Sequence, residues 1–114
     1  MITDGQEERE FLYAQDCCEA LETVMNNYDD FKSDDELHIT SFNSIKIIDI
    51  AHIIQQNFDM IGKKVDVKPS IDIDTVQQNS KNVASNYLTN WWKPRTSLDD
   101  GIAKVFASMK KNYD

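Results

Sequence analysis

Apolar residues recur at the three-to-four-residue spacing of a helix in three stretches of the chain, and this spacing constrains the fold most strongly. The stretches cover residues 17–28, 47–58 and 98–113, and a shorter one covers 83–88. Polar residues fall on the opposite side, so each stretch predicts a helix with one buried face. We expect these faces to form the core rather than to bind a cofactor.

The expected ends of these helices carry recognisable signals. Asp16 precedes the first stretch and Glu19 follows three residues later, which predicts a capping box. Ser97 is placed to cap the last helix in the same way. Gly62 predicts the end of the second helix, because glycine readily adopts the left-handed conformation found there.

Short apolar segments between the helices predict strands at residues 9–14, 37–39 and 65–69. The sum is a small α+β domain of about four helices with a few short strands. The length of 114 residues suits a single domain, residues 1–114. Strands this short pair incompletely with one another, so we expect them to need edges supplied from elsewhere.

Charge is distributed unevenly within the net −8 of the chain. Residues 1–36 hold twelve acidic and two basic residues, a balance of −10, whereas residues 37–114 hold eight acidic and ten basic residues, a balance of +2. The acidic part repels phosphate backbones and the basic residues form no stripe, which argues against nucleic-acid binding.

No apolar run reaches the roughly 20 residues of a membrane span. Residues 1–5 lack the pattern of a signal peptide, so we expect a cytoplasmic protein without a membrane partner.

Cysteine and histidine give no sign of a metal or redox site. Cys17 and Cys18 are adjacent within a predicted helix, where cysteine usually serves as a small apolar residue. His38 and His52 share no ligand spacing with these cysteines, so we expect no metal ion.

Four short motifs occur in an order that resembles a known family. They are Arg9-Glu10-Phe11-Leu12-Tyr13-x-x-Asp16, His38-Ile39-Thr40-Ser41-Phe42, Ile47-x-Asp49-Ile50-Ala51-x-x-Ile54 and Trp91-Trp92-Lys93-Pro94-Arg95-Thr96-Ser97-Leu98-Asp99-Asp100-Gly101-Ile102. Together they resemble the C-terminal, substrate-binding lobe of nucleotide-sugar epimerases and dehydratases of the extended short-chain dehydrogenase/reductase family. Fucose-synthase-like epimerase/reductases and sugar 4,6-dehydratases are the most similar branches. The resemblance spans almost the whole chain.

The resemblance implies a nucleotide sugar as ligand, and NAD(P) as the cofactor of the complete enzyme, bound on an N-terminal Rossmann lobe. We expect that lobe to be absent, because the only glycines are Gly5, Gly62 and Gly101 and no Gly-x-x-Gly-x-x-Gly loop occurs. Tyr28 and Lys32 have the spacing of the family's catalytic pair, but they follow the arginine motif instead of preceding it. We therefore expect no cofactor site, no catalytic residue and no activity of this chain alone.

Four residues are candidates for substrate binding under this resemblance. Arg9 matches the family arginine that reaches the diphosphate, where a guanidinium donates two parallel bonds, or it only neutralises the glutamates around it. Tyr13 lines the sugar pocket or packs in the core. Lys68 replaces a second phosphate contact or is a solvated surface residue. Trp91 stacks on the base or anchors the core.

Two departures from the family pattern bear on function. The turn at residues 40–42 lacks both family glycines, which adds bulk, and no arginine follows Lys68. The first hypothesis is therefore a nucleotide-sugar-binding part that works only with a Rossmann-lobe partner. The alternative is a non-catalytic remnant that acts as a protein-interaction or dimerisation module through self-association.

Overall fold

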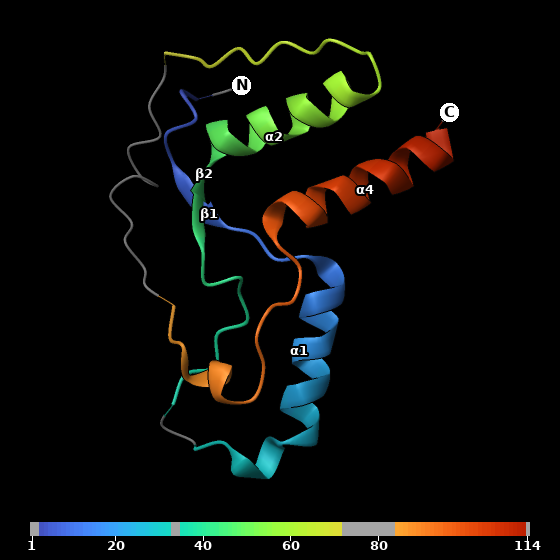
Figure 1. Ribbon diagram of the computed structural model, residues 1–114. Helices are drawn as coiled ribbons and strands as arrows, with labels where there is room; N and C mark the ends of the chain where they lie inside the picture. The colour runs from blue at the N-terminus through green and yellow to red at the C-terminus, as the bar shows by residue number, and fades with distance from the viewer. Residues whose placement is uncertain (1–2, 33–34, 72–83, 114) are drawn as a thin grey trace.

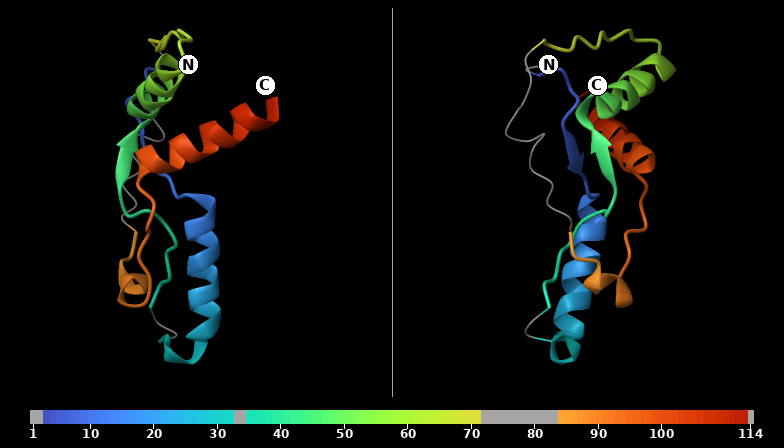
Figure 2. Two further views of the ribbon diagram at one scale, coloured as in Figure 1. Left: turned by 45° about the vertical axis from the view of Figure 1, so that its right-hand side comes forward. Right: turned by 90° about the vertical axis from the view of Figure 1, so that its left-hand side faces the viewer.

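The computed structural model describes residues 3–32, 35–71 and 84–113 of the chain. Their elements, in chain order, are β1 (Glu8–Glu10), α1 (Ala14–Asn26), a 3-10 helix (Tyr28–Asp30), β2 (Ser44–Lys46), α2 (Ile47–Met60), a second 3-10 helix (Tyr87–Asn90) and α4 (Leu98–Tyr113). Figure 1 shows an elongated molecule with α2 and α4 at one end and α1 at the other. The views in Figure 2 show α4 pointing away from α1.

The two strands form one small antiparallel sheet. Glu8 pairs with Lys46, Arg9 with Ile45 and Glu10 with Ser44, so opposite charges face each other at one end. The expected strand at residues 9–14 is therefore shorter and begins one residue earlier. β2 was not among the expected strands. Each strand of this two-stranded sheet keeps one edge that no described strand pairs, so the expectation of an edge supplied from elsewhere stays a prediction.

The other two expected strands are not formed. Leu37 and Ile39 pack against the core from an irregular segment, so their apolar side chains are half-buried without a sheet. Residues 65–69 are also irregular. There, Val65 is exposed and its carbonyl accepts a hydrogen bond from the side chain of Gln55 at 2.8 Å, in place of a neighbouring strand.

Helix α1 does not begin where the sequence signals place it. It starts at Ala14, and Asp16 lies within its first turn rather than capping it. Asp16 is only 2% exposed, and its carboxylate accepts the backbone N–H groups of Arg95 (3.1 Å) and Thr96 (2.8 Å). It also accepts the Thr96 hydroxyl at 3.2 Å. The Asp16 carboxylate therefore accepts hydrogen bonds from residues far away in sequence, and not from the N–H groups of its own helix as in a capping box.

The expected apolar face of α1 is only partly buried. Ala20 is fully buried and Val24 half-buried, whereas Leu21, Met25 and Tyr28 are 51%, 77% and 76% exposed. The spacing correctly predicted a helix. The face of this helix that packs against the core is centred on Asp16 and Ala20, however, and not on the apolar residues as a group. Much of the apolar face is left at the surface.

The ends of the other two helices confirm the sequence signals. Gly62 has a φ of +77°, and Lys63 N donates to Phe58 O at 3.0 Å in the closing turn of α2. No atom lies within 4 Å of a Cβ placed on Gly62, so the backbone angle alone requires glycine. At the start of α4, the Ser97 hydroxyl accepts Asp100 N at 3.2 Å, as a capping serine does.

The described residues contain three α-helices, not the four that the sequence predicts. The helix expected at residues 83–88 is the 3-10 helix Tyr87–Asn90, and Val83 lies outside the described residues. The Thr89 hydroxyl donates to Asn86 O at 2.6 Å and the Asn90 amide to Tyr87 O at 2.9 Å. These side chains occupy carbonyls that a longer helix would use.

The core lies beside α1. Ala20, Leu88 and Trp92 are 0%, 0% and 7% exposed, and half-buried apolar side chains surround them: Leu12, Val24, Phe31, Leu37, Ile39 and Phe42. Trp92 is therefore the core tryptophan.

Among the helices of residues 3–32, 35–71 and 84–113, none is long and apolar enough to cross a membrane.

Candidate functional site

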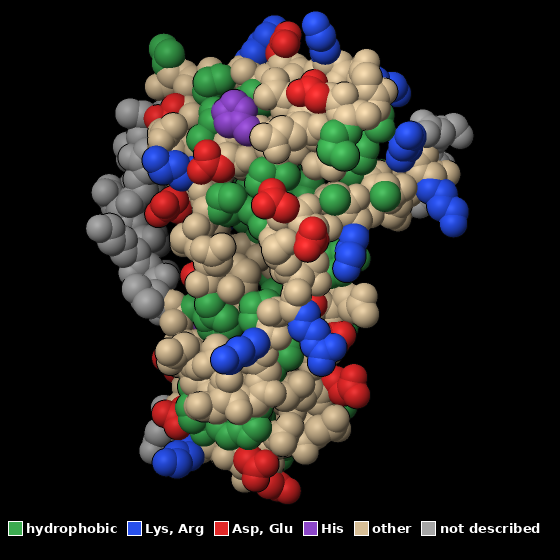
Figure 3. Space-filling model, viewed as in Figure 1, with side chains coloured by type: hydrophobic (Ala, Val, Ile, Leu, Met, Phe, Trp, Pro, Cys, Tyr) green, Lys and Arg blue, Asp and Glu red, His purple; other side chains and the backbone are tan. Residues whose placement is uncertain are grey.

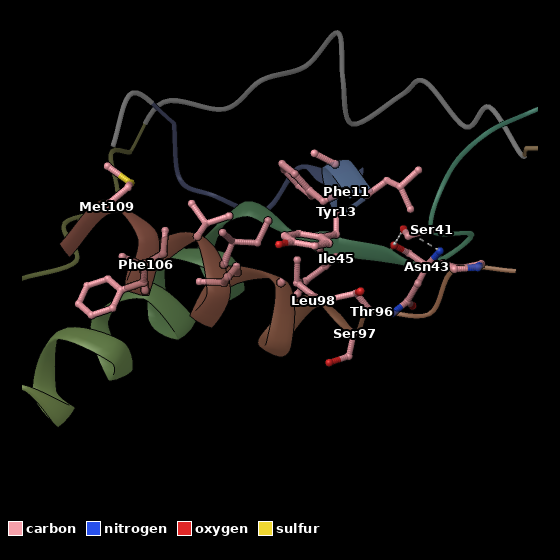
Figure 4. Close-up of a pocket in the computed structure, with 18 of the residues that line it drawn as sticks. Phe11, Tyr13, Ser41, Asn43, Ile45, Thr96, Ser97, Leu98, Phe106 and Met109 are labelled. Atoms are coloured by element: carbon pink, nitrogen blue, oxygen red, sulfur yellow. Dashed lines mark hydrogen bonds between the residues drawn. The ribbon is translucent and has the colours of Figure 1, made fainter. Parts of the chain in front are cut away.

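A large groove opens between α2 and α4, with β2 and the segment before α1 at its base (Figure 4). Its volume is about 1190 Å³. Apolar side chains of the two helices form its walls: Ile50, Ile54, Phe58, Ile102, Val105, Phe106 and Met109. The rings of Phe58 and Phe106 meet edge to face at 4.9 Å and join the two helices. The faces expected to form core are thus the walls of an open groove.

The two ends of the groove differ in chemistry. Figure 4 shows Tyr13 between an apolar end, with Phe106 and Met109, and a polar end. The polar end presents hydroxyl, amide and guanidinium groups from two loops: Ser41, Asn43, Arg95, Thr96 and Ser97. Such groups can donate to and accept from the hydroxyls of a sugar.

The electrostatic character of the groove is basic. Its charged lining residues, within the part of the chain that the structure describes, are Lys63, Arg95 and Lys110. Lys63 follows α2 and Lys110 lies in the last turn of α4, so two of these charges stand at the apolar end. The groove is therefore suited to a ligand or partner that combines apolar surface with negative charge.

The polar end is positioned by contacts from α1. The Asp16 carboxylate holds the backbone of Arg95 and Thr96, which directly precedes α4. Tyr13 packs against this same region, because a Cβ on Gly101 would lie 3.5 Å from its ring. Lys104 Nζ lies 5.3 Å from the centre of the Tyr13 ring, within the range of a cation–π contact.

The turn at residues 40–42 keeps a glycine-like conformation without glycine. Phe42 has a φ of +57°, a left-handed angle that costs a residue with a Cβ about 1–2 kcal/mol. Its ring lies 6.4 Å from that of Trp92 and joins the core. The bulk expected here is therefore turned toward the core, and Ser41 beside it lines the groove.

The four candidate residues are not brought together. Tyr13 lines the groove, and Trp91 lines a separate polar hollow of about 380 Å³. Trp91 also meets Phe31 at 4.7 Å and Tyr87 at 5.0 Å, edge to face, so ring contacts anchor it. Among the described lining residues, Arg9 and Lys68 belong to neither hollow.

Arg9 nevertheless emerges on the groove side of the sheet. It stands opposite Ile45, and directly paired residues of two antiparallel strands project to the same face. Ile45 lines the groove. Arg9 is half-buried, and its Nη1 donates to Glu8 O at 2.8 Å. Lys68 is exposed in the irregular segment after α2.

Sequence reasoning missed the groove and the role of Asn43 and Arg95 in lining it. Arg95 and Thr96 belong to the closing motif, but the motif does not show that they donate hydrogen bonds to Asp16, far away in sequence, at the polar end. The sequence pattern marks the apolar faces of α2 and α4. It carries no signal that would show these faces to be uncovered.

The start of α2 does not offer the N–H groups that a dinucleotide cofactor would need. A pyrophosphate needs free N–H groups at a helix N-terminus next to glycines. At the start of α2, the N–H groups of Ile47 and Ile48 already donate to Glu7 O (3.0 Å) and Gly5 O (2.9 Å). The buried Glu7 adds a carboxylate to this segment. In the described ranges, no group of three His, Cys, Asp or Glu side chains is placed to hold a metal ion.

The chain resembles one known protein in structure and another in sequence. No family model matches the chain. In structure it resembles DdhaC with a TM-score of 0.70 and 24% identity, over 98% of this chain and 32% of that chain. The small α+β fold is thus also found as part of a larger protein.

In sequence, the chain is 32% identical over 112 residues to a GDP-L-fucose synthase of Sinorhizobium fredii (strain NBRC 101917 / NGR234). The match covers 95% of this chain and 32% of that enzyme. The chain therefore spans about a third of the length of each of these proteins. This similarity supports the resemblance to extended short-chain dehydrogenases that the four motifs carry.

Proposed function

We propose that the chain is the substrate-binding part of an NAD(P)-dependent nucleotide-sugar epimerase/dehydratase-like protein and is not catalytic by itself. The observation that carries the proposal is the 32% identity to a GDP-L-fucose synthase over 95% of the chain. In this proposal a partner with a Rossmann lobe supplies the cofactor.

The geometry of the groove is consistent with this role. A sugar fits the polar end, where Ser41, Asn43 and Thr96 offer hydrogen-bonding groups beside the Tyr13 ring. Arg95 lines the same end, and Arg9 projects from the adjacent sheet face. Either guanidinium suits a diphosphate, since it donates two parallel bonds to phosphate oxygens.

Calorimetric titration of the chain with GDP-, dTDP- and UDP-sugars tests the proposal. We expect one of the three to bind, and we expect Arg9→Ala to weaken it at least about tenfold through loss of a charged hydrogen bond. Arg95→Ala tests the other candidate, because Arg9 and Arg95 are the only arginines of the chain and both are placed near the polar end. Absence of binding by all three sugars would overturn the proposal. Loss of binding in Arg95→Ala alone would move the phosphate contact to Arg95.

A second candidate function is a non-catalytic remnant that acts as a protein-interaction or dimerisation module. The exposed apolar walls of the groove favour it, because an uncovered apolar surface of this kind commonly marks a protein contact. The two functions differ in the titration. The remnant binds no nucleotide sugar, yet it associates with a protein surface.

A further inference from the structure

A second apolar surface lies on α1 and adjoins the groove at Ala14. Five exposed residues follow one another at intervals of four, three, four and three along the helix and the turn after it: Ala14, Cys18, Leu21, Met25 and Tyr28. We call this set the α1 stripe. The alternation of four and three is the seam of a helix that packs on another surface along its length. Met25 and Tyr28 are 77% and 76% exposed, so no described part of the chain covers the seam.

The apolar end of the groove is a surface of matching kind. Ile54, Val105 and Met109 are 39%, 49% and 56% exposed along its two helical walls. Figure 3 shows hydrophobic side chains reaching the surface between α2 and α4, with Lys side chains toward the outer end of α4. A helix that lays its apolar face into a groove between two helices is a common mode of recognition.

The lengths of the two surfaces agree. Helix α1 has 13 residues and is therefore about 20 Å long. Helix α4 has 16 residues and gives the groove a wall of about 24 Å. Ala14 belongs to both the stripe and the groove lining, so the two surfaces adjoin on one molecule. This adjacency lets each of two copies place its α1 in the groove of the other, about a two-fold axis.

Charge selects the groove as the partner of the stripe. Glu22, Asp29 and Asp30 are exposed beside the stripe, so two α1 stripes packed together would bring like charges close. At the outer end of the groove stand Lys63 and Lys110. The acidic end of one α1 therefore complements the basic end of the groove in a second copy.

We infer that the chain forms a dimer in which α1 of each copy lies in the apolar end of the groove of the other. The polar end, with Ser41 and Thr96, stays open for a small ligand. The dimer is thus compatible with the proposed function but does not depend on it, because the partner's helix occupies the apolar end of the groove and the sugar would occupy the polar end.

Analytical ultracentrifugation of two single variants tests the dimer. Met25→Glu places a charge on the stripe, and Met109→Glu places a charge on the groove wall. Both positions are exposed, so we expect circular dichroism to show that each variant keeps the fold. We expect each variant to raise the dimer dissociation constant at least about 30-fold, the effect of losing one central contact. Met60→Glu is the matched control, since Met60 is 84% exposed and lies on neither surface.

Mixing the two variants separates reciprocal exchange from other dimers. A Met25→Glu chain keeps its groove and a Met109→Glu chain keeps its stripe, so the mixture contains one intact interface. We expect a 1:1 heterodimer that neither variant forms alone. A wild-type monomer at tens of micromolar overturns the inference. So does a Met109→Glu dimer, which indicates stripe-to-stripe packing, or a Met25→Glu dimer, which indicates groove-to-groove packing. Sugar binding measured on the same variants separates failure of this inference from failure of the proposed function.

Discussion

The α1 half and the α2/α4 half of the molecule differ in how they treat their apolar residues. Around α1, Ala20, Leu88 and Trp92 are buried and form the core. In the other half, no residue of α2 is buried, and α4 leaves Val105 49% exposed. Both halves carry the same helical spacing of apolar residues. The difference teaches that one half covers its apolar residues with its own chain, whereas the other half leaves them uncovered by the described residues.

The largest expected effect comes from cutting one apolar side chain in each half. Leu88→Ala should lower the free energy of unfolding by about 2–5 kcal/mol, because it opens a cavity in a fully buried site. Ile54→Ala should lower it by less than about 1 kcal/mol, since that side chain is 39% exposed. Urea unfolding followed by circular dichroism measures both. Equal losses would remove the distinction between the halves.

An intermediate effect is expected at the link between the halves. Asp16→Ala leaves the N–H groups of Arg95 and Thr96 without their acceptor, at a cost of about 2–3 kcal/mol. Urea unfolding gives the loss, and the amide NMR shifts of these two residues report the broken link. Glu22→Ala is the control, because Glu22 is an exposed acid on the same helix and should change stability by less than about 0.5 kcal/mol. A loss no larger than that of the control would show that Asp16 does not join the halves.

The smallest effect concerns the strained turn beside the core. Phe42→Gly should be more stable than Phe42→Ala by about 1 kcal/mol, because glycine adopts a φ of +57° without a Cβ clash. Both variants lose the same ring, so their difference isolates the backbone angle. At Phe31, where φ is −85°, the order should reverse. Thermal unfolding of the four variants measures the two differences, and the same order at both positions would exclude backbone strain at Phe42.

Local signals in the sequence predicted local structure well. The spacing of residues 47–58 and 98–113 predicted α2 and α4, and Ser97 and Gly62 marked their ends, because helix formation and capping depend on neighbours along the chain. The expected strand at residues 37–39 failed since Leu37 and Ile39 find the core without a sheet. Strand pairing depends on a partner far away in sequence, which spacing does not identify.

The candidate site depended on such distant contacts and was predicted less well. Asp16 looked like a helix cap because its sequence neighbours suit one, yet its partners are Arg95 and Thr96. Of the candidate residues, Tyr13 lines the groove, whereas Arg9 and Lys68 line neither of the described hollows. Apolar spacing shows which residues of α1 and α4 share a face. Whether that face is covered depends on the assembled molecule.

The start of α2 has a consequence for how the molecule assembles. Its first N–H groups donate to the main-chain carbonyls of Gly5 and Glu7 rather than to a capping side chain. The N-terminal residues therefore act as the missing cap, so the stability of the first turn of α2 depends on this segment. Proteolytic trimming of these few residues would fray α2 from its first turn and loosen one wall of the groove. A segment with little regular structure of its own thus supports one wall of the groove.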